Sequence, residues 1–404
     1  LGELSIGRKT GLGAVGAYTQ LGKKYKWIGL LGILAAFCLL AFYNVLGGLV
    51  MRYMFGFFLE ILGVDGFSGQ SGNFFSHILY DYSGMIFFHV LFIVLNIVIV
   101  MGGIQGGIEK FCTVAMPALF FMLLFVIIYV AFQPGAGAGY AFMLTPNFEP
   151  ISTFSGFLNV LKTAAGQMFF SLSLGMGAII SYGSYLDKKQ NIEKNALVIV
   201  ICDTLIALMA GLAVMPARFA LDPEGPIGGP KLLFITMQNV FNSMGTVGYV
   251  FGIIFYLLVI LAAVSSSISL LEVIVAHFVD KARDKGKGDK RKAYSVIAAI
   301  ATGVLCVLVC LDGLGSNGLW QPLGYCWLDF MDLWSEGIMM PLGALFMCIF
   351  IGYEYKVENI AEEIEQGGNV FRTKKVYAVC CKIVVPLAMF LVLFGQLQSF
   401  GIIK

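Results

Sequence analysis

Long runs of hydrophobic residues, separated by short polar segments, dominate the sequence. Each run has about 20 or more residues, the length that an α-helix needs to cross a lipid bilayer. The runs are too long and too evenly apolar for the strands of a membrane β-barrel, so the pattern predicts an all-α integral membrane protein. It predicts nine complete spans, at residues 27–57, 84–104, 112–132, 158–185, 194–216, 247–279, 293–311, 327–353 and 377–397.

An apolar stub, residues 1–7, precedes the first complete span. It begins at Leu1 and lacks the basic start of a signal peptide, so we interpret it as the end of a further span. On this interpretation the sequence is truncated at its N-terminus.

The charges of the loops predict an orientation. Lys and Arg occur at 23–26, 188–194, 281–292 and 372–375, whereas the alternate loops 58–83, 133–157 and 312–326 contain neither residue. Because short cytoplasmic loops carry the excess of Lys and Arg, the basic set is expected inside and the tail after residue 397 outside. The Gly/Ala stretch 134–140 is expected to be a flexible outer loop.

Composition agrees with this class. Apolar residues make up 59% of the 404 residues and charged residues 12%, against about 25% charged in soluble domains. An ordinary soluble enzyme is therefore excluded, and one polytopic domain over residues 1–404 is expected. The net charge is only +2, and the Lys and Arg residues lie in a few short loops and form no single basic face. Nucleic acid is therefore not an expected partner.

The sequence offers little for a transition-metal site or an enzyme. Its nine cysteines include no C-x-x-C pair, and its three histidines are scattered over different segments. No serine stands in a G-x-S-x-G motif. An intramembrane enzyme is therefore disfavoured.

One predicted span is unusual. Its sequence from 166 to 185, GQMFFSLSLGMGAIISYGSY, contains four glycines and four serines, which weaken helical propensity at about mid-membrane depth. A break there would free backbone groups that could bind a small cation or a carboxylate. Close helix packing through small residues explains the composition equally well.

A second segment places oxygen atoms on one helix face. Ala262, Ser265 and Ser266 stand at i, i+3 and i+4, so one carbonyl and two hydroxyls point the same way. Such a set suits a hard monovalent cation, but serines that bond back to the preceding turn produce the same pattern. Both interpretations stay open at this point.

Ionisable residues within the spans carry more information, because each is costly in the bilayer and commonly faces a pathway or a partner. Asp203 lies near the middle of its span and is interpreted as functional. Glu272, Asp332 and Glu336 lie nearer helix ends, where solvation is an alternative explanation.

Several of these motifs together resemble the neurotransmitter:sodium symporter family, and in particular its bacterial eleven-helix amino-acid transporters. The resemblance runs collinearly through almost the whole chain. It rests on the 166–185 segment, the AxxSS motif at 262–266, LDFMDLWSEGIMMPLGALF at 328–346, GIEKFCTVAMPALF at 107–120, YGSYLDKKQNIEKNA at 182–196 and DTLIALMAGLAVMPA at 203–217.

The resemblance implies a LeuT-type fold, in which two five-helix repeats of opposite topology hold the ligands between discontinuous helices. In this family the first helix supplies half of both sodium sites. That helix and most of the second are expected to be missing here, and a chain that truly began at Leu1 would not transport by this mechanism.

The resemblance also implies that sodium ions (Na⁺) are the ions whose gradient drives transport. Ser171 and Asp203, the latter where many relatives have asparagine, would bind the first sodium. Ala262, Ser265 and Ser266 would bind the second. A fixed carboxylate at Asp203 would replace the anion that chloride-dependent relatives need, so transport is expected to be independent of chloride.

An amino acid is the implied substrate. Tyr43 would bind its carboxylate, Phe170 would cover the pocket, and Met176 would stand where relatives commonly have phenylalanine. Because methionine is unbranched and adaptable, a large apolar or aromatic substrate side chain is expected. The residues assigned to the pocket by resemblance are Leu39, Tyr43, Phe170, Ser171, Ser173, Met176, Ser266 and Leu270.

Gating roles follow from the same resemblance. Asp332 would belong to an outer gate and Asp280 to an inner gate, each with an arginine partner expected from the missing region. Tyr185 and Glu272 would support the inner gate, and Glu3 would brace the unwound segments.

The sequence thus predicts a sodium-coupled amino-acid symporter that works by alternating access as a multi-pass protein of the inner (plasma) membrane, surrounded by the lipid bilayer. The alternative is a truncated relative that binds a ligand or partner without transporting it. Neither the identity of the amino acid nor the oligomeric state follows from the sequence.

Overall fold

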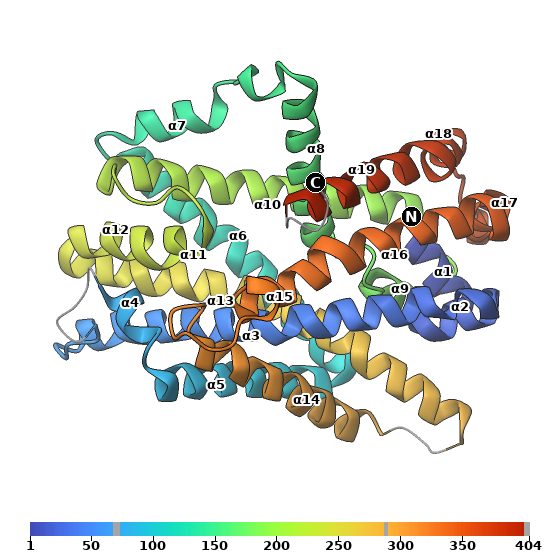
Figure 1. The fold of residues 1–404 in the computed structure, drawn as a ribbon, viewed down its shortest axis with the longest axis horizontal. Helices are drawn as coiled ribbons and strands as arrows, with labels where there is room; N and C mark the ends of the chain where they lie inside the picture. The colour runs from blue at the N-terminus through green and yellow to red at the C-terminus, as the bar shows by residue number, and fades with distance from the viewer. Residues whose placement is uncertain (68–72, 287–289, 400–404) are drawn as a thin grey trace.

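The computed structural model describes residues 1–67, 73–286 and 290–399. Parts of the predicted outer loop 58–83, of the basic loop 281–292 and of the tail after 397 lie outside these ranges. Every regular element in the described part of the chain is helical (Figure 1), so the predicted all-α class is confirmed.

Eight described helices are long and apolar enough to cross a membrane, counted with the 3-10 or π-helical stretches that continue some of them. The ninth predicted span, 158–185, is broken, which is why eight unbroken helices stand where nine were predicted. The eight cover Lys23–Ile61, Tyr82–Met101, Ile104–Ala131, Ile192–Leu221, Thr246–Asp284, Arg291–Asp312, Trp327–Tyr355 and Lys374–Gln398.

The helices follow the apolar runs closely. In chain order the α-helices are α1 Gly2–Thr10, α2 Ala14–Leu21, α3 Lys26–Ile61, α4 Phe74–Ile78, α5 Tyr82–Met101, α6 Lys110–Ala131, α7 Ala136–Leu144, α8 Phe154–Ser171, α9 Ala178–Gly183, α10 Ile192–Leu221, α11 Gly229–Lys231, α12 Met237–Ser243, α13 Gly245–Asp284, α14 Arg291–Asp312, α15 Trp327–Asp332, α16 Met340–Ile349, α17 Val357–Ile364, α18 Lys374–Val379 and α19 Val385–Ser399.

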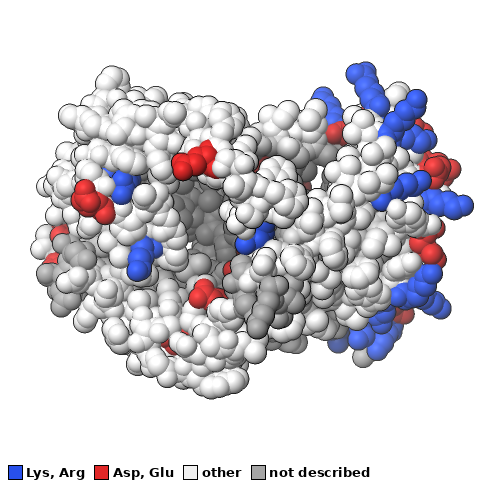
Figure 2. Space-filling model, turned by 45° about the horizontal axis from the view of Figure 1, so that its top comes forward, with Lys and Arg blue, Asp and Glu red and all other residues white. Residues whose placement is uncertain are grey.

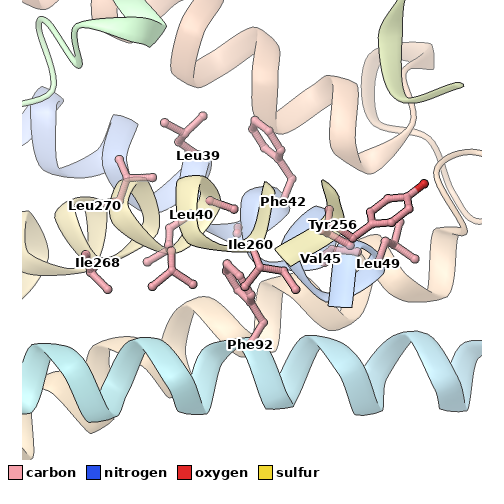
Figure 3. Packing of buried hydrophobic residues seen from close by; sticks show 14 of the residues in the cluster. Leu39, Leu40, Phe42, Val45, Leu49, Phe92, Tyr256, Ile260, Ile268 and Leu270 are labelled. Carbon is pink, nitrogen blue, oxygen red and sulfur yellow. The ribbon is translucent and has the colours of Figure 1, made fainter. Parts of the chain in front are cut away.

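Helices α3 and α13 run side by side through the middle of the molecule, with α5 and α14 packed along one side of the pair (Figure 1). Two adjacent glycines bring α5 close to α3: a Cβ on Gly48 would lie 2.6 Å from the backbone nitrogen of His89, and one on Gly47 would meet the ring of Phe92. Phe92 fills this junction and points from α5 towards α3 and α13 (Figure 3).

The outer loop 133–157 differs from expectation. Its Gly/Ala stretch forms helix α7 instead of a flexible loop. Glycine disfavours helix in isolation, but here it permits close packing on α10, because a Cβ on Gly139 would lie 2.4 Å from the Cα of Pro216. Tertiary contact thus overrides local propensity.

Lys and Arg gather at one end of the molecule (Figure 2), as the alternating loop charges predict. Two ion pairs to one buried carboxylate join α1 and the segment after α9, which carry such residues, to α17. The Nε of Arg8, on α1, donates to Oε1 of Glu363, on α17, at 2.8 Å. The Nζ of Lys188, after α9, donates to the same oxygen at 3.0 Å. The three elements are therefore held together by charge.

Candidate functional site

The predicted helix break lies between α8 and α9. Helix α8 ends at Ser171 and α9 begins at Ala178. Between them Ser173, Gly175 and Gly177 have φ angles of 52°, 78° and 80°, in the left-handed region that interrupts a right-handed helix. The interpretation of residues 166–185 as a broken span is thus confirmed.

Close packing through small residues also holds at this break. A Cβ on Gly175 would lie 2.3 Å from the carbonyl oxygen of Met340, so only glycine fits. The amide of Gly175 donates to Oε1 of Glu3 at 2.8 Å, and the side chain of Glu3 is buried. This bond places Glu3 directly against the unwound segment.

A cavity of about 650 Å³ lies beside the break, bounded by α3, α6, α8, α10 and α13. All the residues that the resemblance assigned to substrate or sodium line it together, although they are spread from residue 39 to residue 270 of the sequence. They are Leu39, Tyr43, Phe170, Ser171, Ser173, Met176, Asp203, Ala262, Ser265, Ser266 and Leu270.

The first oxygen cluster in the cavity wall joins α8 to α10. The hydroxyl of Ser171 donates to Oδ1 of Asp203 at 2.6 Å, and both side chains are half-buried. Ser171 is the last helical residue before the break, so the break and the mid-span carboxylate meet at this bond. Hydroxyl and carboxylate oxygens are the donors that hard cations prefer.

The second oxygen cluster lies on α13. Ser265 donates its hydroxyl proton to the carbonyl oxygen of Ala262 at 2.8 Å, the back-bonding that was one of the two interpretations. Ser266 lines the cavity together with Tyr43 of α3. The three oxygen-bearing residues therefore share one wall, as their spacing indicates.

The remaining wall of the cavity is mostly apolar. The rings of Tyr43 and Phe170 lie 6.2 Å apart between centroids, tilted by 50°. Met176 and Leu270 are buried behind them. A ligand in this cavity would therefore meet both oxygen atoms and hydrocarbon.

Sequence reasoning missed several cavity residues on α6, α8 and α10. Their spacing carries a signal that could have found most of them, because 116, 119 and 120 on α6, and 202, 205 and 206 on α10, each stand at i, i+3 and i+4. The missed residues are Met116, Leu119, Phe120, Gln167, Cys202, Leu205 and Ile206.

The predicted inner-gate residues fall into two places. Tyr185 donates to Oε1 of Glu272 at 3.4 Å. Arg291, which sequence reasoning missed, donates to Oε2 of Glu272 at 2.6 Å and to the Tyr185 hydroxyl at 3.0 Å. Asp280 lies apart from this bond set and accepts from the amide of Gly13 at 2.7 Å.

The predicted outer-gate residue, Asp332, is the last residue of α15, and Glu336 follows one helical turn later. Neither lines the cavity described above. Within the described ranges, no group of three or more His, Cys, Asp or Glu residues is arranged to hold a metal ion. The cavity oxygens suit a hard monovalent cation, since hydroxyl and carbonyl groups predominate.

Comparisons with known proteins agree with this geometry. Residues 77–403 match the profile described as "Sodium:neurotransmitter symporter family". A Bacillus subtilis protein named "Uncharacterized sodium-dependent transporter YhdH" is 31% identical over 97% of this chain and 84% of its own length. An uncharacterized sodium-dependent transporter of Haemophilus influenzae is 33% identical over 98% of this chain and 86% of its own.

A solved structure is similar throughout. The crystal structure of MhsT in complex with L-phenylalanine superimposes with a TM-score of 0.83 at 31% identity, and the match covers 98% of this chain and 87% of that one. The similarity extends over the broken span and the helices around the cavity.

Proposed function

The chain belongs to the sodium:neurotransmitter symporter family, and we propose that it couples the inward movement of sodium to the uptake of an amino acid with a hydrophobic or aromatic side chain. Relatives named as sodium-dependent transporters and the LeuT-type fold support sodium-coupled transport by a multi-pass membrane protein. We place it in the plasma (inner) membrane, with transport by alternating access. The observation that carries the proposal is the cavity at the helix break, which is lined by two oxygen clusters and by apolar side chains.

Sodium is assigned to the two oxygen clusters. Ser171 and Asp203 would contribute to the first ion, and Ala262, Ser265 and Ser266 to the second. Donation of a hydroxyl proton leaves the lone pairs of that oxygen available to a cation. Sodium would favour the outward-open state because it binds that state more tightly than the inward-open one.

An amino acid is assigned to the space between Tyr43, Phe170 and Met176. The phenol of Tyr43 would donate to the substrate carboxylate, and the ring of Phe170 would cover the substrate from outside. The buried Met176 and Leu270, with Leu39 and Ser173, would surround its side chain. The related MhsT was crystallised with L-phenylalanine, which favours the same class of substrate here.

The gates are assigned to charged groups outside the cavity. Tyr185, Glu272 and Asp280 would act at the inner side, and Asp332 at the outer side. Glu3 would brace the unwound segment through its bond to Gly175.

Uptake into proteoliposomes tests the proposal. Labelled tryptophan, leucine and phenylalanine would be supplied under an inward sodium gradient, with an equal potassium gradient as the control. Accumulation that requires sodium is expected, and equal uptake in both salts would refute sodium coupling. Sodium-dependent binding without accumulation would favour the alternative of a non-transporting relative.

Chloride replacement is the companion measurement. The Asp203 carboxylate supplies a fixed negative charge beside the first cation cluster, so no further anion is needed for charge balance. Replacing chloride by gluconate at constant sodium is expected to leave uptake unchanged, and abolished uptake would contradict this part of the proposal.

A further inference from the structure

A buried polar cluster lies on the side of α3 and α13 away from the cavity. It consists of Asn44 on α3, Asn96 on α5 and Ser267 on α13, none of them more than 2% exposed. The Ser267 hydroxyl donates to Oδ1 of Asn96 at 2.6 Å. The amide of Asn96 donates to Oδ1 of Asn44 at 3.4 Å and to the carbonyl of Phe92, on its own helix, at 3.0 Å. Asn96 thus links three helices.

Two members of this cluster directly follow cavity residues. Asn44 comes after Tyr43, and Ser267 comes after Ser266. Successive residues of an α-helix point about 100° apart, so the same two helical turns present one pair to the cavity and the other pair to α5. Tyr43 and Ser266 both line the cavity. The two turns therefore carry ligand-facing residues on one side and the bonded polar cluster on the other.

Apolar side chains make most of the remaining contact between α3 and α13 near this level. Leu39, Leu40, Ile260 and Ile268 lie there, as Figure 3 shows. In a membrane, such contacts fix the register of two helices weakly, since lipid tails are as apolar as leucine. Directional bonds between buried polar groups fix it more strictly. Asn96 supplies those bonds at the level of the proposed ligand contacts.

We propose that Asn96, which does not touch the cavity, is a positioning residue that sets the register of Tyr43 against Ser266 and so tunes the affinity for both the amino acid and the second sodium. The inference rests on the function proposed above. Binding sites need their contact groups held to about 0.5 Å. Loss of Asn96 would let α3 and α13 shift relative to each other, which would disturb both ligands together.

The test uses Asn96→Leu, which keeps a similar shape without the amide, and Ser267→Ala, which removes the same bond from the other side. Ser295→Ala is the matched control: Ser295 is fully buried on α14, and its hydroxyl donates to the carbonyl of Arg291, on its own helix, at 3.0 Å. For each protein, the sodium concentration for half-maximal binding of labelled phenylalanine, the phenylalanine Kd at saturating sodium and the thermal unfolding midpoint would be measured.

Asn96→Leu is expected to weaken both affinities by about 3- to 20-fold, the range that corresponds to interhelical hydrogen bonds in membranes. Ser267→Ala is expected to act in the same direction, and the double variant to bind no more weakly than Asn96→Leu alone, because Asn96→Leu already removes the bond that Ser267→Ala deletes. Ser295→Ala is expected to keep both affinities within twofold.

Three results would overturn the inference: unchanged affinities in folded Ser267→Ala and Asn96→Leu protein, additive effects in the double variant, or an equal loss in Ser295→Ala. If Asn96→Leu does not fold, the smaller Ser267→Ala change decides. Absence of sodium-dependent binding in the unmodified protein would instead refute the proposed function, and this inference with it.

Discussion

Asp203→Asn is the substitution that separates the charge of the first oxygen cluster from its shape. The amide oxygen can still accept the Ser171 hydroxyl, which now donates to Oδ1 of Asp203 at 2.6 Å. What disappears is one negative charge in the wall of the cavity. A change in sodium binding therefore reports the electrostatic part of the site, with little change in packing.

The expected magnitude follows from two limits. At an effective dielectric constant of 20, unit charges 4 Å apart attract by about 4 kcal/mol. The net loss on neutralising Asp203 is smaller than this, because the charged carboxylate also has a desolvation cost, which the neutral amide avoids. Hydrogen bonds to charged groups contribute about 1.5–3 kcal/mol net. We therefore expect sodium affinity to fall by about 10- to 150-fold.

The assay is a sodium titration of labelled phenylalanine binding, with choline as the replacement cation. Asp222→Asn is the matched control, because Asp222 caps the outer end of the same helix and bonds Asn239 at 3.1 Å, away from the cavity. Chloride should stimulate binding in Asp203→Asn and leave the unmodified protein unaffected. A sodium affinity within twofold of the original, or an equal loss in Asp222→Asn, would refute the electrostatic reasoning.

Three other substitutions test the fold and the pocket. Glu363→Gln leaves a fully buried arginine without its counter-ion and should cost about 3–5 kcal/mol in a denaturant titration, whereas Glu354→Gln at an exposed pair should cost less than about 1 kcal/mol; equal losses would contradict this. Gly175→Ala should abolish phenylalanine binding, since a Cβ would lie 2.3 Å from a backbone oxygen, while Gly137→Ala meets nothing within 4 Å and should bind normally. Met176→Phe should shift preference towards smaller substrates in competition assays, and unchanged relative affinities would refute the pocket assignment.

Much of the fold could be predicted because one physical rule dominates it. A run of about 20 apolar residues must form a helix in lipid, and the predicted span 293–311 differs from α14, Arg291–Asp312, by only two residues at its start and one at its end. Helix α7 escaped prediction because its stability depends on contact with α10, which no local pattern encodes.

The cavity was also largely predictable, since cation ligands recur at helical spacing and the break has a clear glycine and serine signature. Long-range partners were not. Arg291 precedes a span and gives no local sign that it bonds Glu272. Asn96 does carry a signal, as the single polar residue of the run FIVLNIVIV, but only the structure shows that it faces Asn44 and Ser267.

The two interpretations of the serine motif on α13 are compatible in three dimensions. Ser265 back-bonds to Ala262 at 2.8 Å, which uses its proton and leaves its lone pairs free. Ser171 likewise donates its hydroxyl proton, to Oδ1 of Asp203 at 2.6 Å, and keeps its own lone pairs free. In each cluster the hydroxyl donates to an oxygen that is itself a proposed cation ligand. Cation binding would therefore compete with a bond that the protein already makes, because that bond occupies one lone pair of the acceptor. The net affinity for sodium is then a difference between two oxygen contacts, which makes it sensitive to small shifts of α8, α10 and α13, the kind of shift that alternating access requires.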